Sequence, residues 1–210
     1  MHAGLPSPIS DFGYICAYDL DGRESSFLRL CIMMTINTPA NDPFTTLAID
    51  AYAVAARGLP RHEECTELIF ADFGIEGRKY LLRPDAADAW HAMKAAAATD
   101  GISLIVASAF RSVARQVELI EKKLDEGQSI EQILTYMAPP GYSEHHSGRA
   151  IDIVTPACPK LEEWFDTTTA FAWLTEHAAN YRFTLSLPRG NSLGFVYEPW
   201  HWCYHAPSDH

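Results

Sequence analysis

The chain has 210 residues, of which 48% are hydrophobic and 20% are charged, the balance of an ordinary globular protein. A chain of this length suits one domain with an added tail, and such a domain can bury most of its apolar surface. Sixteen lysines and arginines against 27 acidic residues give a net charge of -11, which argues against nucleic-acid binding because that function requires a basic face.

Residues 1–41 carry scattered Gly, Pro and Ser without sustained periodicity. They are predicted to form a weakly ordered tail or strap before a single folded domain over residues 42–210. The apolar run at residues 27–36 is interrupted by Arg29 and is too short to span a bilayer, so no transmembrane segment is expected. The run also lacks the features of a secretory signal, which favours a cytoplasmic location, with the cell envelope as the alternative.

The first half of the domain is predicted to be mainly helical. Arg83-Pro84-Asp85 opens a helix whose apolar residues recur at helical spacing, and Gly101 ends it. A short run rich in branched apolar residues follows at residues 102–107 and predicts a buried strand. The other helices are expected at residues 44–57, 111–126 and 130–136.

The second half of the domain mixes strands with helices. Residues 138–141 form a firm break, and one or two closing strands are expected around Pro199. The predicted strands cover residues 148–154, 183–187 and 195–204, and the predicted helices cover residues 161–165 and 169–179. Because strands and helices do not alternate regularly, this order predicts an α+β fold, with helices packed on a small, mostly antiparallel sheet.

Two short segments contain the residues with recognisable chemistry. Residues 142–152 read Tyr-Ser-Glu-His-His-Ser-Gly-Arg-Ala-Ile-Asp, and residues 197–202 read Tyr-Glu-Pro-Trp-His-Trp. Catalytic zinc takes three protein ligands from histidines and carboxylates and keeps a fourth position open for water. Zinc lowers the pKa of that water toward about 7, and a nearby carboxylate can act as general base. The segments supply these groups, although residue type alone does not decide between His145 and His146.

Asp152 lies in an apolar stretch between Ile151 and Ile153. A carboxylate in such a strand must be paired or bound to a metal, because burying a bare charge is costly. The plain alternative to a metal ligand is a buried ion pair with Arg149 or Arg182.

Pro199 is expected to interrupt regular strand pairing, so that Glu198 and His201 can face one site despite their spacing of three residues. Glu198 would then be the general base beside a ligand, and the alternative is an ordinary charge at a strand edge. Trp202 is expected in the core, whereas Trp200 is expected either to shape the site or to pack in the core.

These segments resemble the VanY-type D-alanyl-D-alanine carboxypeptidases of the LAS zinc metallopeptidases, whose motifs are S-x-H-x-x-G-x-A-x-D and, later, E-x-W-H. Both motifs match in full, at Ser143, His145, Gly148, Ala150 and Asp152 and at Glu198, Trp200 and His201. The resemblance covers roughly residues 80–204 and implies a LAS/hedgehog-like fold. The predicted domain over residues 42–210 would then be the catalytic domain. The resemblance also implies that His145, Asp152 and His201 bind Zn²⁺, with His145 chosen over His146. Glu198 is then the catalytic base.

An upstream segment, residues 108–116, resembles the family pattern S-x-[YF]-R-S-x-x-x-Q. The resemblance implies that Arg111 binds the substrate or stabilises the reacting centre, and a guanidinium can hold a carboxylate in a bidentate geometry. The alternative is an arginine that caps or pairs on a helix face. Gln116, Ser143 and Trp200 are expected to assist in substrate binding. Val113 stands where many relatives carry an aromatic residue, which bears on fine substrate preference.

The resemblance predicts a zinc-dependent D,D-carboxypeptidase that removes the terminal D-alanine from a peptidoglycan stem peptide or precursor. An L,D-carboxypeptidase, a D,D-dipeptidase or a peptidoglycan endopeptidase of the same fold are alternatives. A second class of alternative is a non-catalytic, zinc-stabilised module that binds wall peptides, since a fold does not fix a function.

Overall fold

A computed structural model describes residues 42–207, so the predicted tail at residues 1–41 lies outside the described part of the chain. The described residues form helices packed with two antiparallel sheets, one of four strands and one of two. The prediction of an α+β fold built on a small antiparallel sheet is therefore confirmed. In this part of the chain, no helix has the length and apolar character needed to cross a membrane.

The larger sheet has the strand order β3-β4-β6-β5, and each neighbouring pair is antiparallel. Its strands are β3 (Ile105–Ser108), β4 (Ala150–Val154), β5 (Phe183–Leu185) and β6 (His201–Tyr204). β4 and β6 are buried along their whole length, so both faces of the sheet centre are covered. Residues 195–204 were expected to form one or two strands. They form one, β6, which begins after Pro199.

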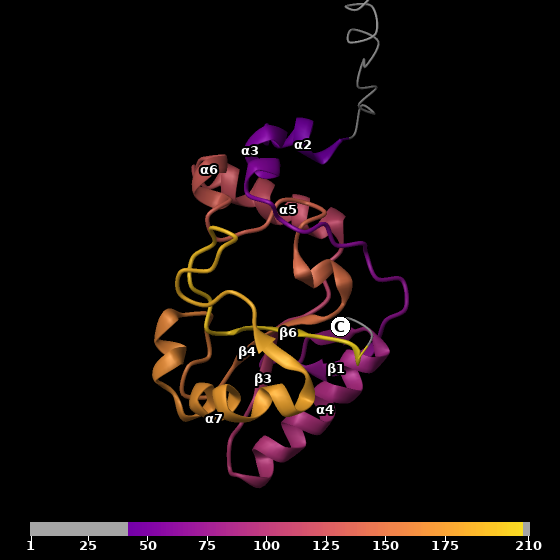
Figure 1. The fold of residues 1–210 in the computed structure, drawn as a ribbon, viewed down its shortest axis with the longest axis vertical. Coiled ribbons are helices and arrows are strands. Elements are labelled where there is room, and N and C mark those ends of the chain that lie inside the picture. The colour runs from indigo at the N-terminus through magenta and orange to yellow at the C-terminus, as the bar shows by residue number, and fades with distance from the viewer. Residues whose placement is uncertain (1–41, 208–210) are drawn as a thin grey trace, which may run out of the picture. The chain divides into compact units, whose positions relative to one another are not determined.

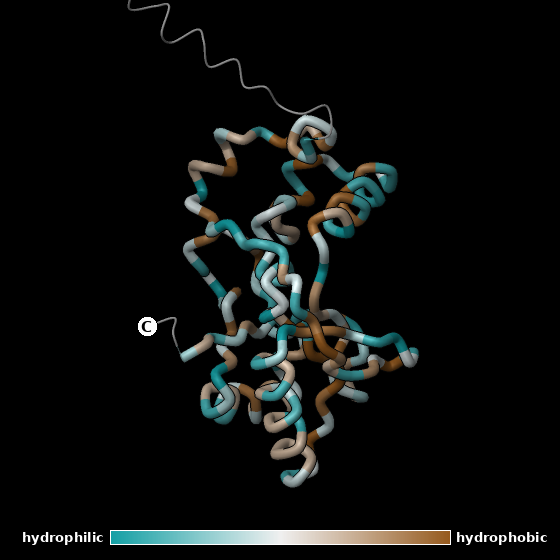
Figure 2. Tube along the Cα trace, turned by 90° about the vertical axis from the view of Figure 1, so that its right-hand side faces the viewer, coloured by the Kyte–Doolittle hydropathy of each residue, from teal (hydrophilic) through white to brown (hydrophobic). Residues whose placement is uncertain are grey.

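One face of this sheet packs against two helices, α4 (Pro84–Thr99) and α7 (Thr169–His177), which lie below the strands in Figure 1. The main core contains Trp90 and Met93 from α4, Trp173 and Leu174 from α7, and Ile151, Ile153, Trp202 and Tyr204 from the strands. Figure 2 shows hydrophobic segments gathered inside this half of the domain. Since side chains alternate along a strand, Asp152 and His201 point to the opposite face.

Four helices form a second half with its own core, on the other side of the sheet in Figure 1. They are α2 (Pro43–Thr46), α3 (Ala51–Ala56), α5 (Val113–Asp125) and α6 (Ile130–Ile133). Each begins at a residue whose side chain accepts a hydrogen bond from a backbone N–H of the first turn, as N-cap residues do. These caps are Asp42, Asp50, Ser112 and Ser129.

The structure differs from the sequence prediction at three further places. The single helix expected at residues 44–57 is two short helices, because the chain turns between them through Ala48, which has a φ of 53°. Near Phe165 the helix is a 3-10 helix, η2 (Glu163–Thr167). A two-stranded sheet, β1 (Ile69–Phe73) with β2 (Lys79–Leu82), was not predicted.

Gly148 connects the 3-10 helix η1 (Glu144–Ser147) to β4, and it adopts a left-handed conformation with a φ of 68°. A Cβ atom at this position would lie 3.1 Å from the backbone nitrogen of Arg83 and 3.2 Å from the Leu68 side chain. The backbone N–H of Arg83 donates to the carbonyl oxygen of Gly148 at 3.0 Å. Glycine is thus required here both for its backbone angle and for the close approach of a second segment.

We expect Gly148→Ala to destabilise the protein by about 2–4 kcal/mol, since left-handed strain and crowding add together. Gly190 is a matched control, because it has the same φ of 68° but nothing within 4 Å of its Cβ position. Gly190→Ala should cost only about 1 kcal/mol from backbone strain. Urea denaturation of both variants measures the difference, and equal losses would show that the crowding at Gly148 has no energetic effect.

Candidate metal centre

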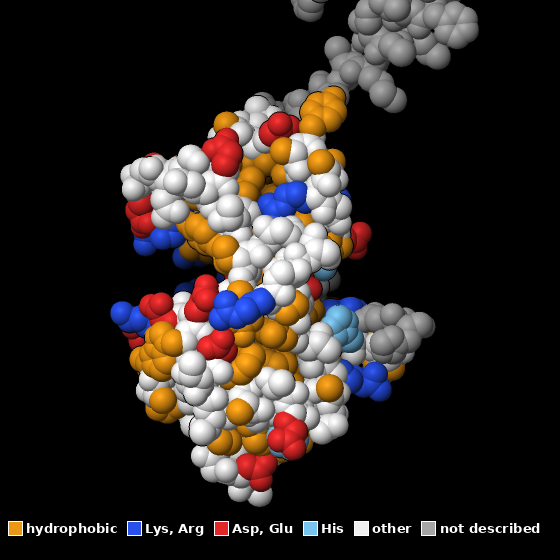
Figure 3. All heavy atoms as spheres, turned by 60° about the vertical axis from the view of Figure 1, so that its left-hand side comes forward, with side chains coloured by type: hydrophobic (Ala, Val, Ile, Leu, Met, Phe, Trp, Pro, Cys, Tyr) orange, Lys and Arg blue, Asp and Glu red, His pale blue; other side chains and the backbone are white. Residues whose placement is uncertain are grey.

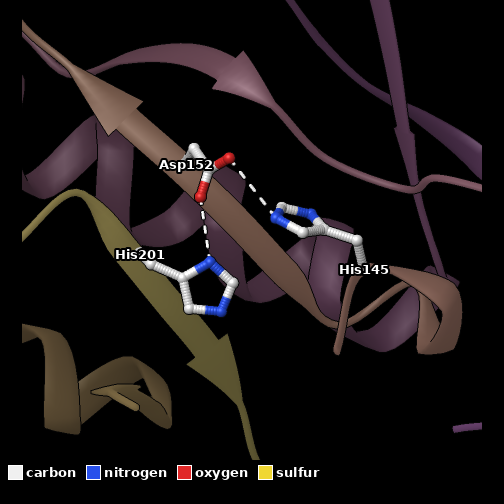
Figure 4. Close-up of side chains that lie close together, drawn as sticks. All are labelled: His145, Asp152 and His201. Carbon is white, nitrogen blue, oxygen red and sulfur yellow. Dashed lines mark hydrogen bonds and ion pairs between the residues drawn. The ribbon is translucent and has the colours of Figure 1, made fainter. Parts of the chain in front are cut away.

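Three side chains converge on the face of the sheet that points away from α4 and α7. His145 comes from η1, Asp152 from the middle of β4 and His201 from the start of β6. Asp152 and His201 are directly paired across the two strands, which places them on the same face. All three are buried, and one potential ligand atom from each lies within 4.8 Å of the others. The structure therefore brings together the three ligands that the sequence predicts (Figure 4).

The hydrogen bond made by His145 fixes which of its ring nitrogens can bind a metal. Its Nδ1 lies 2.7 Å from the carbonyl oxygen of Ala109. A carbonyl oxygen can only accept, so Nδ1 carries the hydrogen. The other nitrogen, Nε2, faces a carboxylate oxygen of Asp152 at 3.3 Å. Because Nδ1 is used by Ala109, Nε2 is the ring nitrogen of His145 that is available to a metal ion.

His201 uses its nitrogens in the reverse order. Its Nε2 lies 2.8 Å from Oε2 of Glu144, and its Nδ1 lies 2.9 Å from Oδ1 of Asp152. Burial lowers the pKa of His201, but its hydrogen bonds to the two carboxylates outweigh burial and raise that pKa well above the usual value. The two carboxylates that favour a positive charge on this ring also favour a cation beside it.

Asp152 completes the donor set as an ionised carboxylate. Burial alone raises its pKa, but the charges and hydrogen bonds of His145 and His201 outweigh burial and hold the pKa well below its usual range. Two imidazoles and one carboxylate are a ligand set that catalytic zinc uses. The chemistry of these residues therefore fits a zinc ion bound by His145 Nε2, Asp152 and His201 Nδ1.

Glu198 lies three residues before His201, in a turn that includes Pro199. Its backbone N–H donates to Leu187 and its carbonyl oxygen accepts from the N–H of His201, both at 3.1 Å. Burial raises the pKa of the Glu198 carboxyl to about 7, and the nearby charge of Asp152 adds to the rise. A carboxyl with this pKa can both accept and donate a proton near neutral pH.

Arg111 lies between β3 and α5, and its guanidinium is held in place by two side chains. Nη1 donates to Gln116 Oε1 and Nη2 donates to Ser108 Oγ, each at 3.0 Å. Burial lowers the pKa of Arg111, while Asp152 and Glu198 oppose that change. The side chain is thus a half-buried cation whose remaining N–H groups can bind a ligand.

The predicted assisting residues take different places. Ser143 and Trp200 line the same pocket as the three predicted ligands, and Trp200 also packs against the main core. Gln116 is fully buried, lies behind Arg111 and donates to the carbonyl oxygen of Ala138 at 2.7 Å. Trp202 lies in the main core, as expected.

The pocket has a volume of about 560 Å³ and lies between the two cores, where Figure 3 shows the surface hollowed. The pocket is lined by the three predicted ligands and also by Glu198 and Arg111. Apolar side chains from both halves form much of its wall, including Leu59, Met137, Tyr142, Leu161, Leu187, Leu193, Phe195 and Val196. The site can therefore receive a partly apolar ligand that carries a negatively charged end.

Sequence analysis missed two features that hold the site together. One is Glu144, which contacts His201. The other is the backbone after β3, which holds both histidines. The carbonyl oxygen of Ala109 accepts from His145 Nδ1, and the N–H of Arg111 donates to the carbonyl oxygen of His145 at 3.1 Å. The carbonyl oxygen of Arg111 accepts from His146 Nδ1 at 2.6 Å. The presence of a carboxylate next to a ligand histidine was a usable signal for Glu144, since ligating histidines commonly donate to carboxylates.

The structure also accounts for the choice between the two neighbouring histidines. Both ring nitrogens of His146 are used by the backbone, because Nδ1 donates to Arg111 and Nε2 accepts from the N–H of Gly141 at 3.1 Å. His146 is fully buried and lies outside the group of convergent ligands. It therefore fixes the loop, and neither of its ring nitrogens is available to a metal ion.

Comparisons with known proteins agree with this geometry. The family model of VanY, D-alanyl-D-alanine carboxypeptidase, matches residues 79–207. YodJ of Bacillus subtilis, whose name describes it as a carboxypeptidase, is 31% identical over 179 residues. That match covers 81% of this chain and 62% of the relative, so the chain spans less than two thirds of the relative's length.

Two solved structures are similar over most of the described residues. The structure of the LD-carboxypeptidase LdcB has a TM-score of 0.61 and 29% identity, and the match covers 69% of this chain and 71% of that chain. A mutant of the vancomycin-resistance D,D-pentapeptidase VanY, in complex with Zn(II), has a TM-score of 0.55 and 25% identity, with 69% and 81% covered. The resemblance inferred from the sequence motifs is therefore confirmed.

We expect Glu198→Gln to stabilise the zinc-free protein at pH 8 but not at pH 4. The folded pKa of about 7 exceeds the unfolded value near 4.5, so the unfolded chain loses its proton first and the folded state loses stability as pH rises between these values. Between these pH values the free energy of unfolding falls by about 3 kcal/mol. Glutamine cannot ionise, so the variant does not undergo this fall.

Urea denaturation at both pH values, with chelator present, tests this expectation. Glu118→Gln is the control, since Glu118 is exposed on α5 and a surface change should shift stability by less than about 0.5 kcal/mol. A gain for Glu198→Gln of the same size at pH 4 and pH 8 would contradict a raised pKa at this site.

Proposed function

Because the chain belongs to the VanY family of D-alanyl-D-alanine carboxypeptidases, we propose that it is a zinc-dependent carboxypeptidase. Its proposed reaction is removal of the C-terminal D-alanine from peptidoglycan stem peptides. The observation that carries this proposal is one pocket in which His145, Asp152 and His201 lie together with Glu198 and Arg111.

The three convergent residues are the proposed zinc ligands, through Nε2 of His145, the carboxylate of Asp152 and Nδ1 of His201. When bound, zinc polarises the scissile carbonyl and makes a water molecule acidic enough to lose a proton near neutral pH. Three protein ligands leave a fourth position open, as in catalytic zinc sites.

Glu198 is the proposed general base and acid. In its carboxylate form it takes a proton from the attacking water, whose oxygen forms a bond to the carbonyl carbon. It then gives that proton to the amine nitrogen as the C–N bond breaks, so a carboxylate and a free D-alanine are formed. The pKa of about 7 suits both steps.

Arg111 is the proposed binding group for the terminal carboxylate of the peptide. Its guanidinium is already held by Gln116 and Ser108, so little conformational freedom is lost when a substrate binds. A preorganised cation near the reacting centre also stabilises negative charge as it develops on the carbonyl oxygen. Ser143 and Trp200 are proposed to contact the peptide from the pocket wall.

The second candidate is an L,D-carboxypeptidase, which would take D-alanine from a tetrapeptide stem. The similarity to a solved LD-carboxypeptidase, at 29% identity and a TM-score of 0.61, supports this candidate. The proposed ligands, base and arginine would serve either bond, because the two reactions differ only in the residue that precedes the terminal D-alanine. A non-catalytic binding module is less favoured, since a structural zinc requires no nearby base such as Glu198.

Zinc-loaded protein should remove one D-alanine from a stem pentapeptide, and mass spectrometry with and without chelator measures that loss. Glu198→Gln should reduce kcat by about 10²–10⁴-fold, because it removes the proton transfer. Loss of D-alanine from the tetrapeptide alone would support the L,D candidate. Stoichiometric zinc binding without turnover of either peptide would instead indicate the binding module.

We expect Arg111→Lys to lower kcat/KM by about 10–100-fold, since a lysine keeps the charge but cannot form the forked pair with a carboxylate. Arg115→Lys, on the exposed face of α5, is the control and should have no effect. A C-terminally amidated peptide, which lacks the terminal carboxylate, should be a poor substrate for the wild type. Its kcat/KM should fall little further in the Arg111→Lys variant. An equal additional loss on the amidated peptide would place Arg111 elsewhere than at the terminal carboxylate.

A further inference from the structure

Glu144 is a half-buried carboxylate for which the proposed reaction has no use. It lies in η1 directly before His145, and its Oε2 atom contacts two groups. Ser186 Oγ donates to this oxygen at 2.6 Å, and Nε2 of His201 lies 2.8 Å from the same oxygen. Burial alone raises the pKa of Glu144, but the hydrogen bonds and charge of His201, together with Ser186, outweigh burial and lower it to about 2.

Glu144 determines which nitrogen of His201 can bind a metal. A carboxylate only accepts hydrogen bonds, so the nitrogen that faces Glu144 must carry the hydrogen. Nε2 is that nitrogen, so Nδ1, which lies 2.9 Å from Oδ1 of Asp152, is the nitrogen left to give up its hydrogen and bind a metal. Without Glu144, a neutral His201 could carry its hydrogen on Nδ1 and donate to Asp152, which would mask the ligand atom.

We infer that Glu144 is a positioning residue that holds His201 in the tautomer required for zinc binding, with Ser186 orienting the Glu144 carboxylate. This inference rests on the proposed zinc site. The two ligand histidines are then oriented differently, since His145 donates to the neutral carbonyl of Ala109 and His201 donates to a charged carboxylate. Charged acceptors make the stronger hydrogen bonds.

Zinc affinity of purified full-length variants, measured by competition with a chromophoric chelator, tests the inference. Glu144→Leu removes both charge and acceptor, and it should weaken zinc binding by about 10–100-fold, the range for loss of an outer partner. Glu144→Gln keeps an oxygen that can accept from His201 and should fall between Glu144→Leu and the wild type. Glu64→Gln removes one negative charge from a carboxylate that caps α5 through Val113 and should bind zinc like the wild type.

Nitrogen-15 NMR of the His201 ring separates positioning from a general loss of structure. We expect hydrogen on Nε2 in the zinc-loaded wild type and in Glu144→Gln, and a population with hydrogen on Nδ1 in zinc-free Glu144→Leu at a pH where the ring is neutral. Circular dichroism checks that each variant is folded, and the isosteric Glu144→Gln keeps the test available if Glu144→Leu does not fold.

Folded Glu144→Leu that binds zinc within about twofold of the wild type would overturn the inference, since the expected loss is tenfold or more. If only Glu144→Gln folds, the inference would be overturned by a variant that binds zinc as tightly as the wild type while its His201 ring carries hydrogen on Nδ1. Failure of the wild type itself to bind zinc would instead reject the proposed zinc site. An intact zinc affinity with no peptide turnover would reject the proposed reaction alone.

Discussion

The antiparallel pairing of β4 with β6 is the constraint on which the metal centre depends. It places Asp152 opposite His201 on one face, while the flanking residues Ile151 and Trp202 enter the main core on the other. A slip of one residue would exchange the two faces and bury the ligands among hydrophobic side chains. The hydrophobic core therefore sets the register, and the register in turn sets the geometry of the ligands.

Electrostatics divides the acidic residues around this centre into two kinds. Asp152 is buried and Glu144 is half-buried, but hydrogen bonds from histidines hold their pKa values low, to about 2 for Glu144. Glu198 is half-buried, and the opposing effects of His201 and Arg111 do not outweigh desolvation, so its pKa rises to about 7. This separation of pKa values supports the proposed roles, in which the first kind stays anionic and Glu198 transfers a proton.

The motifs predicted which side chains would converge, because each motif combines residue types that zinc chemistry requires with a fixed spacing. They did not predict contacts between distant segments, such as that between Glu144 and His201, which depend on how the chain folds. The two-stranded sheet was also missed, because Ile69 and Phe70 in β1 are both exposed, so the strand lacks the usual alternation of apolar and polar residues. The prediction of one helix over residues 44–57 was wrong at Ala48, because this non-glycine residue adopts a positive φ that a sequence pattern does not reveal.

The ligands and the pocket wall come from different parts of the structure. The ligands stand on the sheet and on the short helix beside it, whereas much of the wall comes from the helical half and from loop residues such as Leu193 and Val196. Substitutions in the wall can change the shape of the pocket without altering strand register or metal geometry. Natural variation in substrate range can therefore accumulate in the loops while the chemistry is inherited unchanged, as in other folds that carry binding loops on a rigid scaffold.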